Sequence, residues 1–393
     1  MNKEKKINPE LRFSEFRNNW IENELRNLEI YVADGNYGEL YPKATQFNID
    51  GIPFIRVNNI RNGRIVWNDM KFINLELHEV LKSGHLKTND VLVSTRGEIG
   101  LVAYVTEQFD NANINAQLCL LRSNSVNTLM LFYYLQSAYG QVQFKRLQTG
   151  SALKQLPKGN LSSLKINLPS IEEQVKIATF LSLIDRKIDL LEKKTELLEQ
   201  QKRGLLQKIF SQEIRFRKND GSNFDKWFSK KLSETVTYHA SNLSQSFINE
   251  QNKGIYKVYG AIGLIGTSIN YIHSSPYISI VKDGAGVGRV QKCEAFTSCT
   301  STLGALINSD DTNIDFIYYL INTIDFKKFI VGSTIPHIYF KDYGELKVEI
   351  PSLEEQKHIV NFLVKYDLLI DNIKVQIEKT EELKRGLLQK MFV

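Results

Sequence analysis

The sequence feature that most constrains this chain is an internal repeat. Residues 168–210 and 350–392 align without a gap at an offset of 182 residues, and 21 of the 43 aligned positions are identical. The phrase Lys-Arg-Gly-Leu-Leu-Gln-Lys stands at 202–208 and again at 384–390. Because a repeat fixes the architecture before any local feature does, the chain is predicted to contain two copies of one unit.

Both copies of the repeat carry the signals of a long helix. Ser170 with Glu173, and Ser352 with Glu355, have the spacing of a capping box, and each pair follows a proline. Apolar residues then recur at alternating steps of four and three, which is typical of a coiled coil. Each helix would be about 60 Å long at the standard rise per residue. The residues expected to pair the helices are Ile177, Leu181, Ile184, Ile188 and Leu191 in the first copy, and Ile359, Leu363, Tyr366, Ile370 and Ile373 in the second.

Two features of this apolar seam are unusual, and both are duplicated. Lys202 and Lys384 occupy seam positions, and Gly204 and Gly386 lie inside the helices, where glycine costs about 1 kcal/mol relative to alanine. A lysine near a helix end can extend its ammonium group to water, and a glycine can arise by drift. A shared requirement explains a duplicated feature better, and we expect another backbone to approach closely at the glycines.

The repeat extends upstream of the helices. Leu11-Arg12-Phe13 with Trp20 resembles Ile214-Arg215-Phe216 with Trp227, and VLVSTRGEIGLV (91–102) resembles YISIVKDGAGVGRV (277–290). Each unit is therefore predicted to be a globular α/β domain followed by a long helix. The globular parts have diverged much more than the helices, as expected if a common scaffold holds two modules with different tasks. Drift of surface loops in a duplicated fold is the alternative.

Composition and motifs exclude several classes of function. The net charge of +6 permits a nucleic-acid partner without requiring one. The chain lacks an apolar run long enough to span a membrane and a secretory signal, so we expect a cytoplasmic protein. Three scattered cysteines and six dispersed histidines give neither a disulfide framework nor a metal motif. The sequence also lacks a phosphate-binding P-loop and a nucleophile elbow, and we expect no active site in this chain.

The loops of both globular parts carry side chains suited to nucleic acid. Arginine and asparagine read the edges of guanine and adenine, and serine, threonine and lysine bind phosphates. The residues predicted to bind DNA are Arg56, Asn58, Asn59, Arg61, Arg64, Arg96, Ser151 and Lys154 in the first part, and Tyr256, Lys257, Tyr259, Lys282, Arg289, Thr300, Ser301, Ser333 and His337 in the second. Each residue taken alone is more often an ordinary solvated surface side chain than a DNA contact, and the prediction rests on their collection in the loops of two matched domains.

In this order of parts, the sequence resembles the specificity subunit of a Type I restriction-modification system. The resemblance rests on the paired motifs LPSIEEQ (168–174) and IPSLEEQ (350–356), on the recurring LLQK, and on LRFSEFRNNW (11–20). It implies an α+β fold in which two pseudo-repeated α/β target-recognition domains are joined by two long antiparallel coiled-coil helices. The expected segments are a first target-recognition domain (1–168), a central helix (169–212), a second target-recognition domain (213–350) and a C-terminal helix (351–393).

The resemblance also implies a function and partners. The two domains would each read one half of a gapped site in double-stranded DNA, and the helices would act as a ruler that sets the gap. The chain would be non-catalytic and would hold no cofactor or metal of its own. Two modification subunits would use S-adenosylmethionine for adenine-N6 methylation, and two restriction subunits would use ATP and Mg. An alternative is a non-enzymatic coiled-coil interaction scaffold with two globular ligand-binding heads.

Overall fold

The structure is a computed structural model that describes residues 8–151, 153–244 and 254–393. It divides into two compact units, and each is described by itself. The first unit comprises the chain up to Glu192 together with Val375–Val393, and the second comprises Lys193–Lys374. Each long helix therefore begins in one unit and ends in the other.

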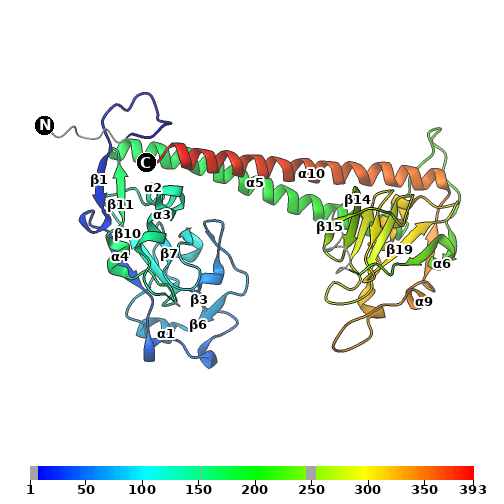
Figure 1. Cartoon of the computed structure of the whole chain (residues 1–393), viewed down its shortest axis with the longest axis horizontal. Coiled ribbons are helices and arrows are strands. Elements are labelled where there is room, and N and C mark those ends of the chain that lie inside the picture. Colours follow the sequence, from blue (N-terminus) through cyan, green and yellow to red (C-terminus); the bar gives the residue numbers. More distant parts are fainter. Residues whose placement is uncertain (1–7, 152, 245–253) are drawn as a thin grey trace. The chain divides into compact units, whose positions relative to one another are not determined.

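The central sheet of the first unit is antiparallel, with the strand order β2-β10-β7-β8 (Figure 1). A smaller sheet, β6-β3-β9, contains one parallel pair, and β1-β11 and β4-β5 form two-stranded ladders. The strands are β1 (Ile21–Glu24), β2 (Tyr31–Asp34), β3 (Ile52–Ile55), β4 (Ile60–Arg61), β5 (Arg64–Ile65), β6 (Lys71–Ile73), β7 (Val91–Ser94), β8 (Val102–Tyr104), β9 (Asn113–Ile114), β10 (Leu118–Arg122) and β11 (Lys165–Leu168).

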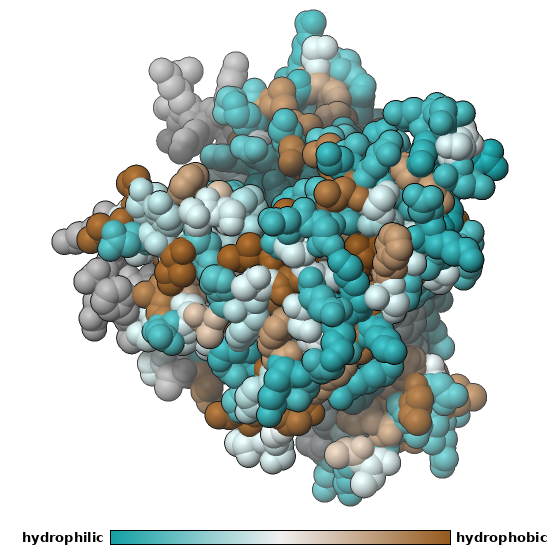
Figure 2. Space-filling model, turned by 90° about the vertical axis from the view of Figure 1, so that its right-hand side faces the viewer, coloured by the Kyte–Doolittle hydropathy of each residue, from teal (hydrophilic) through white to brown (hydrophobic). Residues whose placement is uncertain are grey.

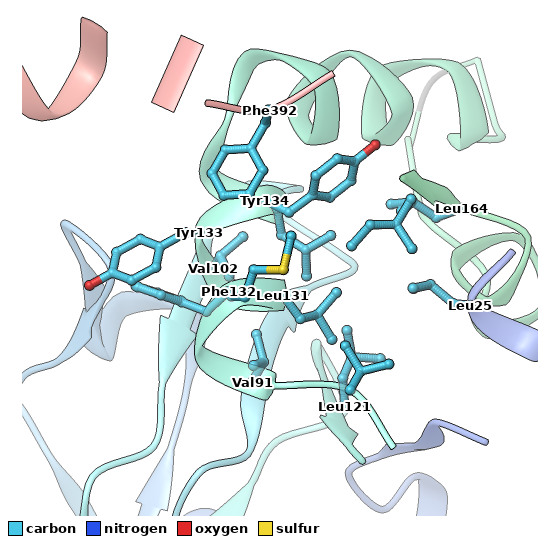
Figure 3. Packing of buried hydrophobic residues seen from close by; sticks show 14 of the residues in the cluster. Leu25, Val91, Val102, Leu121, Leu131, Phe132, Tyr133, Tyr134, Leu164 and Phe392 are labelled. Atoms are coloured by element: carbon cyan, nitrogen blue, oxygen red, sulfur yellow. The ribbon is translucent and has the colours of Figure 1, made fainter. Parts of the chain in front are cut away.

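The core of the first unit is built around helix α2 (Thr128–Gln136). Its sequence TLMLFYYLQ is apolar on nearly every face, and a helix of that kind is stable only when it is buried on all sides. Figure 3 shows its side chains between Val91, Val102 and Leu121 of the sheet and Phe392 near the chain end. The other helices are α1 (Leu75–Val80), α3 (Ala138–Leu147) and α4 (Lys158–Ser162), with 3-10 turns η1 (Leu25–Asn27), η2 (Gly38–Leu40), η3 (Ala44–Gln46), η4 (Val57–Asn59) and η5 (Glu107–Phe109).

The second unit repeats the central sheet, the smaller sheet and the β1-β11 ladder of the first, whereas the β4-β5 ladder has no counterpart among its described residues. Its central sheet has the order β13-β19-β16-β17, its smaller sheet β15-β14-β18 again contains one parallel pair, and β12 pairs with β20. The strands are β12 (Phe228–Lys231), β13 (Val236–Ala240), β14 (Tyr256–Gly260), β15 (Gly263–Ser268), β16 (Tyr277–Val281), β17 (Val290–Cys293), β18 (Ser298–Cys299), β19 (Leu303–Asn308) and β20 (Lys347–Ile350). Its helices are α6 (Leu232–Thr235), α8 (Ile314–Ile321) and α9 (Phe340–Tyr343), with the 3-10 turn η6 (Phe326–Phe329).

The two long helices are α5 (Ile171–Phe210) and α10 (Leu353–Lys390). In the first unit, the beginning of α5 and the end of α10 pack together on α2, with Leu181 and Leu388 in one core. In the second unit, the beginning of α10 and the end of α5 pack on α8, with Leu363 and Leu206 in one core. The helices are antiparallel in both units, and the predicted α+β fold with two pseudo-repeated domains and two long antiparallel helices is confirmed.

Candidate nucleic-acid interface

In the first unit, a basic turn and a glycine-serine loop meet at the end of the buried strand β7. The turn begins at Arg96, and the loop 149–155 closes on itself through paired backbone hydrogen bonds between Thr149 and Gln155 (2.8 and 2.9 Å). The amide of Leu156 donates to the carbonyl of Thr95 at 2.8 Å, which fixes the loop to the turn. Gly150 has φ +90°, and a Cβ there would lie 2.4 Å from a backbone oxygen, so the loop requires glycine.

The second unit contains the same arrangement at the end of β16. Lys282 begins the turn, and the loop 331–337 closes through hydrogen bonds between Val331 and His337 (2.9 and 2.8 Å). Gly332 has φ +88°, and a Cβ there would lie 2.5 Å from a backbone oxygen. The loop and its glycine with positive φ therefore recur at the same place in both units, although the loop sequences GSALKQ and GSTIPH differ.

Two further loops join each of these clusters. In the first unit, the backbone amide of Asn115 donates to the carbonyl of Ile55 at the end of β3 (2.9 Å), and the backbone amide of Thr95 donates to the carbonyl of Gln117 (2.8 Å). In the second unit, Thr300 donates to Tyr259 and Lys282 to Thr302, both at 3.0 Å. Segments far apart in the sequence thus converge on one edge of each unit. We call these two edges the loop faces: residues 56–62, 96–100, 115–117, 149–151 and 153–155 in the first unit, and 259–263, 282–289, 300–302 and 331–337 in the second.

The first loop face is hollowed. It contains an open depression of about 710 Å³, and half of the residues that line it carry amide or guanidinium groups, with one carboxylate, Glu98. Among the lining residues are Tyr41, Asn58, Arg61, Asn62 and Gln117. Donors and acceptors of this kind match those on the base edges in a DNA groove.

The predicted DNA-binding residues fall into three groups, which are exposed, buried and half-buried. Those with exposed side chains on the loop faces are Asn58, Arg61, Arg96, Ser151 and Lys154 in the first unit, and Arg289 and Ser333 in the second. Within the described part of the chain, the Arg61 guanidinium group has no hydrogen-bond or ion-pair partner, whereas the Asn58 side chain donates to Asp69 at 3.2 Å. Arg289 donates to the carbonyl of Ala261 at 3.0 Å and remains an exposed residue.

Several other predicted residues have structural tasks. Asn59 is fully buried, and its amide group holds the carbonyls of Val66 and Asn68, so in this structure its side chain supports the loop and is not available to DNA. Thr300 is also buried and shares a hydrogen bond with Thr302 at 3.0 Å, so it cannot present its hydroxyl to a ligand.

The remaining predicted residues are half-buried and mostly paired. Arg56 binds Asp69 at 2.9 Å, Arg64 binds Glu192 of α5 at 2.7 Å and also Asp189, and Lys257 binds Glu294 at 2.7 Å. Arg64 therefore anchors the β4-β5 turn on the long helix. Tyr256 packs on Tyr271, and Tyr259 and Ser301 line the second loop face with half-exposed side chains.

His337, Asp283 and Lys282 form an ion-pair cluster on the second loop face. The His337 Nδ1 atom lies 2.7 Å from an Asp283 oxygen, and Lys282 pairs with the other oxygen. Burial alone would raise the pKa of Asp283, but the hydrogen bonds from Lys282 and His337 outweigh it and lower that pKa. The carboxylate offsets the positive charge of this cluster.

Tyr37 and Gln117 also lie beside the first loop face, although their residue types and sequence positions do not predict it. The guanidinium carbon of Arg96 lies 5.0 Å from the centre of the Tyr37 ring, and the Tyr37 hydroxyl donates to Asp34 at 2.8 Å. Burial, reinforced by Asp34, raises the pKa of Tyr37 to about 12. Neither residue lies near the predicted loops in the sequence, and only the strand pairing brings them together.

Each domain is tied to its long helix by a buried carboxylate. Glu173 accepts two hydrogen bonds from Arg12 (both 2.7 Å) and one from the indole of Trp20 (3.3 Å). Glu355 accepts the same set from Arg215 (2.8 and 2.9 Å) and Trp227 (3.0 Å). These contacts account for the duplicated Arg-Phe and Trp motifs.

The predicted capping boxes are therefore only partly right. The amide of Glu355 donates to the Ser352 hydroxyl at 3.4 Å, as the motif predicts. The carboxylates of both glutamates, however, bind the arginine and tryptophan of the preceding segment. A partner with a positive charge competes better for a buried carboxylate than a backbone amide does.

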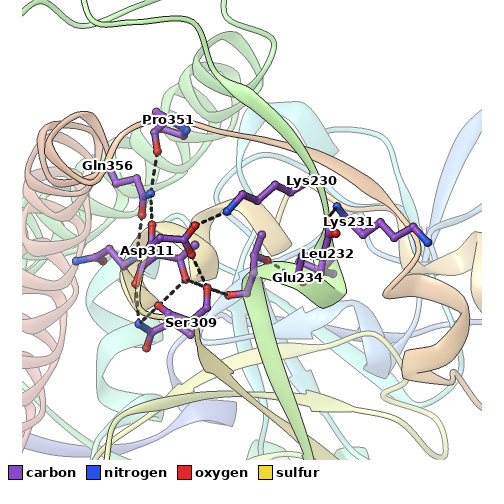
Figure 4. A network of polar contacts seen from close by, with 12 residues as sticks. Lys230, Lys231, Leu232, Glu234, Ser309, Asp311, Pro351 and Gln356 are labelled. Carbon is purple, nitrogen blue, oxygen red and sulfur yellow. Dashed lines mark hydrogen bonds and ion pairs between the residues drawn. The ribbon is translucent and has the colours of Figure 1, made fainter.

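The glutamine that follows each glutamate connects the long helix to the central helix of its domain. Gln356 donates to Pro351 (2.9 Å) and to Asp311 (3.1 Å), and it accepts from the amide of Asn313 at 2.7 Å, at the start of α8 (Figure 4). Gln174 makes the equivalent bonds to Pro169 (3.0 Å) and from Asn127 (3.0 Å), at the start of α2. The recurring Glu-Glu-Gln motif thus fixes where the helix leaves the domain.

The predicted helix-pairing residues face inward. Ile177, Leu181, Ile188, Ile359, Leu363, Ile370 and Ile373 are buried, and Ile184, Leu191 and Tyr366 are half-buried. Several of them contact the globular core as well as the other helix, because Ile177 and Leu181 belong to the core around α2. The seam therefore has a second task, which is to dock each domain.

The seam lysines are held by ion pairs. Lys384 binds Asp185 at 2.7 Å and Lys202 binds Asp367, so neither simply extends to water. At Gly204 and Gly386, a Cβ would meet no described atom within 4 Å beyond the local helix backbone. The chain itself therefore does not supply the expected close backbone approach, which stays a prediction for a partner.

The described residues contain no group of three or more His, Cys, Asp or Glu side chains that could hold a metal ion. No helix within the described ranges is both long and apolar enough to cross a lipid bilayer. The surface drawn in Figure 2 mixes hydrophilic residues with scattered hydrophobic ones. The loop faces, with their exposed amide and cationic groups, are thus the strongest candidate binding sites.

Comparison with known sequences identifies one family. The family model described as Type I restriction modification DNA specificity domain matches residues 32–200 and again residues 225–382. The chain is 25% identical to the putative type I restriction enzyme MjaX specificity subunit of Methanocaldococcus jannaschii, over 95% of this chain and 93% of that protein. It is 24% identical to the EcoprrI specificity subunit of Escherichia coli, over 82% of each chain.

Solved structures show the same fold. The S subunit of a Type-I restriction-modification system from M. genitalium superposes with a TM-score of 0.59 at 17% identity, covering 98% of this chain and 99% of that one. A second structure, described as concerning complex assembly and conformational transition of the type I R-M system, gives a TM-score of 0.55 at 16% identity, covering 94% of this chain and 96% of that one.

Proposed function

Because the chain belongs to the Type I restriction modification DNA specificity family, we propose that it selects the DNA site on which a Type I restriction-modification complex acts. The observation that carries this proposal is the duplicated loop face. Two domains of one topology present the same turn and glycine-serine loop, and each carries its own set of exposed polar and cationic side chains. This arrangement suits a bipartite site whose halves differ in sequence.

Each loop face would combine base reading with backbone contacts. In the first unit, Arg61 and Asn58 border the hollow and suit guanine and adenine edges, while Ser151 and Lys154 suit phosphates. On the second loop face, Arg289 is the exposed arginine. Since the two sets of side chains differ, the two half-sites would differ as well.

The long helices would set the gap between the half-sites. A helix of about 60 Å corresponds to at most about 18 base pairs at 3.4 Å per pair. Deleting one heptad from both α5 and α10 would shorten the pair by about 10.5 Å and should shorten the accepted gap by about three base pairs. An active variant with an unchanged gap would contradict the ruler.

The chemistry belongs to other subunits. The chain is the non-catalytic specificity subunit, and it assembles with other subunits of the system and with DNA. We further propose two modification subunits, which use S-adenosylmethionine to methylate adenine N6, and two restriction subunits, which use ATP and Mg. We also propose a cytoplasmic location, because the complex would act on DNA inside the cell.

The decisive experiment is to express the chain with the modification subunit of its own system in a host free of DNA methylation, and then to map N6-methyladenine. The expected result is one gapped two-part motif, methylated once on each strand. If the two proteins copurify without producing methylation, DNA binding by the pair separates an inactive methyltransferase from a wrong assignment. A pair that does not bind DNA would favour a scaffold with ligand-binding heads.

A further inference from the structure

A tyrosine, an aspartate and a lysine from three helices meet in the first unit. The Tyr133 hydroxyl, on α2, donates to Asp185 of α5 at 2.7 Å, and the Lys384 ammonium, on α10, binds the other oxygen of Asp185 at 2.7 Å. Lys384 also lies over the Tyr133 ring, 5.4 Å from its centre. Burial, reinforced by Asp185, raises the pKa of Tyr133, so the hydroxyl stays protonated and remains a donor.

The second unit contains the same cluster with the helices exchanged. The Tyr319 hydroxyl, on α8, donates to Asp367 of α10 at 2.5 Å, and Lys202 of α5 binds the other oxygen of Asp367. Lys202 lies 5.1 Å from the centre of the Tyr319 ring. Each long helix therefore supplies the aspartate of one cluster and the lysine of the other.

These clusters are poor devices for stability alone. The lysines occupy seam positions and are mostly buried, with 14% of the Lys384 side chain and 18% of the Lys202 side chain exposed. The free-energy cost of removing two charged groups from water offsets much of their mutual attraction. An apolar pair at the same buried position is often at least as stable. A polar residue at one seam position of a coiled coil does, however, select the register of the helices.

The seam needs such a selection because its apolar residues recur in every heptad. A shift of one helix by seven residues would again bring apolar residues together along most of its length. In one direction, the shift would place Asp185 opposite Ile377 and Lys202 opposite Val360. In the other direction, Asp185 would face Met391. Either shift leaves charges without partners, which is strongly unfavourable.

We propose that the two Tyr-Asp-Lys clusters are the positioning residues that fix the register of the helix pair and thereby the length of the DNA gap. This proposal rests on the proposed function of the chain. One shifted heptad moves a domain along the helix by about 10.5 Å, which is about three base pairs. The tyrosine couples the same aspartate to the central helix of each domain, so register and domain docking are selected together.

The test replaces both lysines by leucine, in Lys202→Leu/Lys384→Leu, and assays methylation on a DNA library in which the half-sites are fixed and the spacer varies in length. Wild type should methylate one spacer length. The variant should stay folded, and methylation of spacers about three base pairs longer or shorter should rise about tenfold relative to the original spacer. The sequences of the half-sites should not change, because the loop faces are intact.

Two controls separate register selection from a general loss of structure. Lys374→Leu makes the same substitution on α10 at an exposed ion pair with Glu199, 2.9 Å away, and should leave one spacer length. Lys202→Arg/Lys384→Arg keeps the charges and should restore that single length. If the leucine variant does not fold, Tyr133→Phe/Tyr319→Phe is tested instead, because it removes only the hydrogen bonds of the two hydroxyl groups. It should raise methylation of the longer or shorter spacers, by a smaller factor than the leucine variant would.

A folded leucine variant that methylates only the wild-type spacer would overturn the proposal. If the leucine variant is unfolded, a tyrosine variant that methylates only the wild-type spacer would overturn it. An increase of equal size in Lys374→Leu would overturn it too, because the effect would then follow from added apolar surface. If wild type itself directs no methylation to a gapped site, the proposed function fails, and this inference fails with it.

Discussion

Replacing Glu173 by glutamine should lower the melting temperature of the protein by about 5–15 °C. The Glu173 carboxylate is 1% exposed and accepts three hydrogen bonds, two from Arg12 at 2.7 Å and one from Trp20 at 3.3 Å. Glutamine keeps the shape of the side chain but has one oxygen and one amide group. The amide group would then point a donor at the donors of Arg12 or Trp20.

The magnitude follows from the number of groups left without a partner. Breaking a buried ion pair by removing one partner costs about 3–5 kcal/mol. Glutamine retains one acceptor, which leaves a loss of about 2–4 kcal/mol. For a unit of roughly 200 residues, each kcal/mol lowers the melting temperature by about 2–4 °C. An arginine that remains buried opposite a neutral amide accounts for most of this loss.

The assay is thermal unfolding followed by circular dichroism, with Glu172→Gln as the matched control. Glu172 is the neighbouring residue and is exposed, so its substitution should move the melting temperature by no more than about 2 °C. The double variant Arg12→Met/Glu173→Leu should recover part of the loss, because it removes both charges. Equal melting temperatures for the Glu173 and Glu172 variants would refute the reasoning.

Three further predictions concern other parts of the molecule. Arg61→Ala should weaken binding of the cognate DNA about 10- to 100-fold and relax the sequence specificity at only one half-site, as measured from the methylation motif. Arg289→Ala should relax the specificity at only the other half-site. Loss of specificity at both half-sites in either variant would contradict two independent loop faces. Burial raises the pKa of the Cys119 and Cys299 thiols to about 12 and also raises that of Cys293, so few thiolates exist at pH 8, and a disulfide reagent should label the native protein much more slowly than the urea-unfolded protein; equal rates would show that the thiols are accessible. Gly204→Leu/Gly386→Leu should weaken copurification of the modification subunit at least about tenfold without changing the melting temperature by more than a few degrees, because the two positions are open in this chain; unchanged copurification would remove the proposed reason for the glycines.

The sequence by itself determined the architecture of this protein. A heptad seam and a repeat at constant offset are properties of consecutive residues, and they specify two long helices without knowledge of any distant contact. The residues that pair the helices, such as Leu181 and Leu363, are buried as the periodicity predicts. The sequence also shows the repeated Arg-Phe and Trp motifs. Its spacing predicts that the glutamate inside each helix motif forms a capping box, whereas in the structure that glutamate binds the arginine and the tryptophan.

Only the tertiary structure decided which polar residues are available to a ligand. Asn58 and Asn59 are neighbours of the same type, yet one is exposed on the loop face and the other is buried and holds the loop. Arg61 and Arg64 lie three residues apart, yet Arg61 stays unpaired within the described residues while Arg64 binds two carboxylates of α5. A residue type states which bonds a side chain can make, and the fold determines whether protein groups already make them.

The seam lysines show the same limit at the level of energy. Lys202 and Lys384 could be recognised as exceptions to the apolar pattern, because a pattern is local. Their partners lie on the other helix and are reached only after the chain has formed two domains and reversed its direction. Composition and periodicity predict which side chains are buried. The position of a compensating charge depends on contacts between residues far apart in the chain, and only tertiary packing creates those contacts.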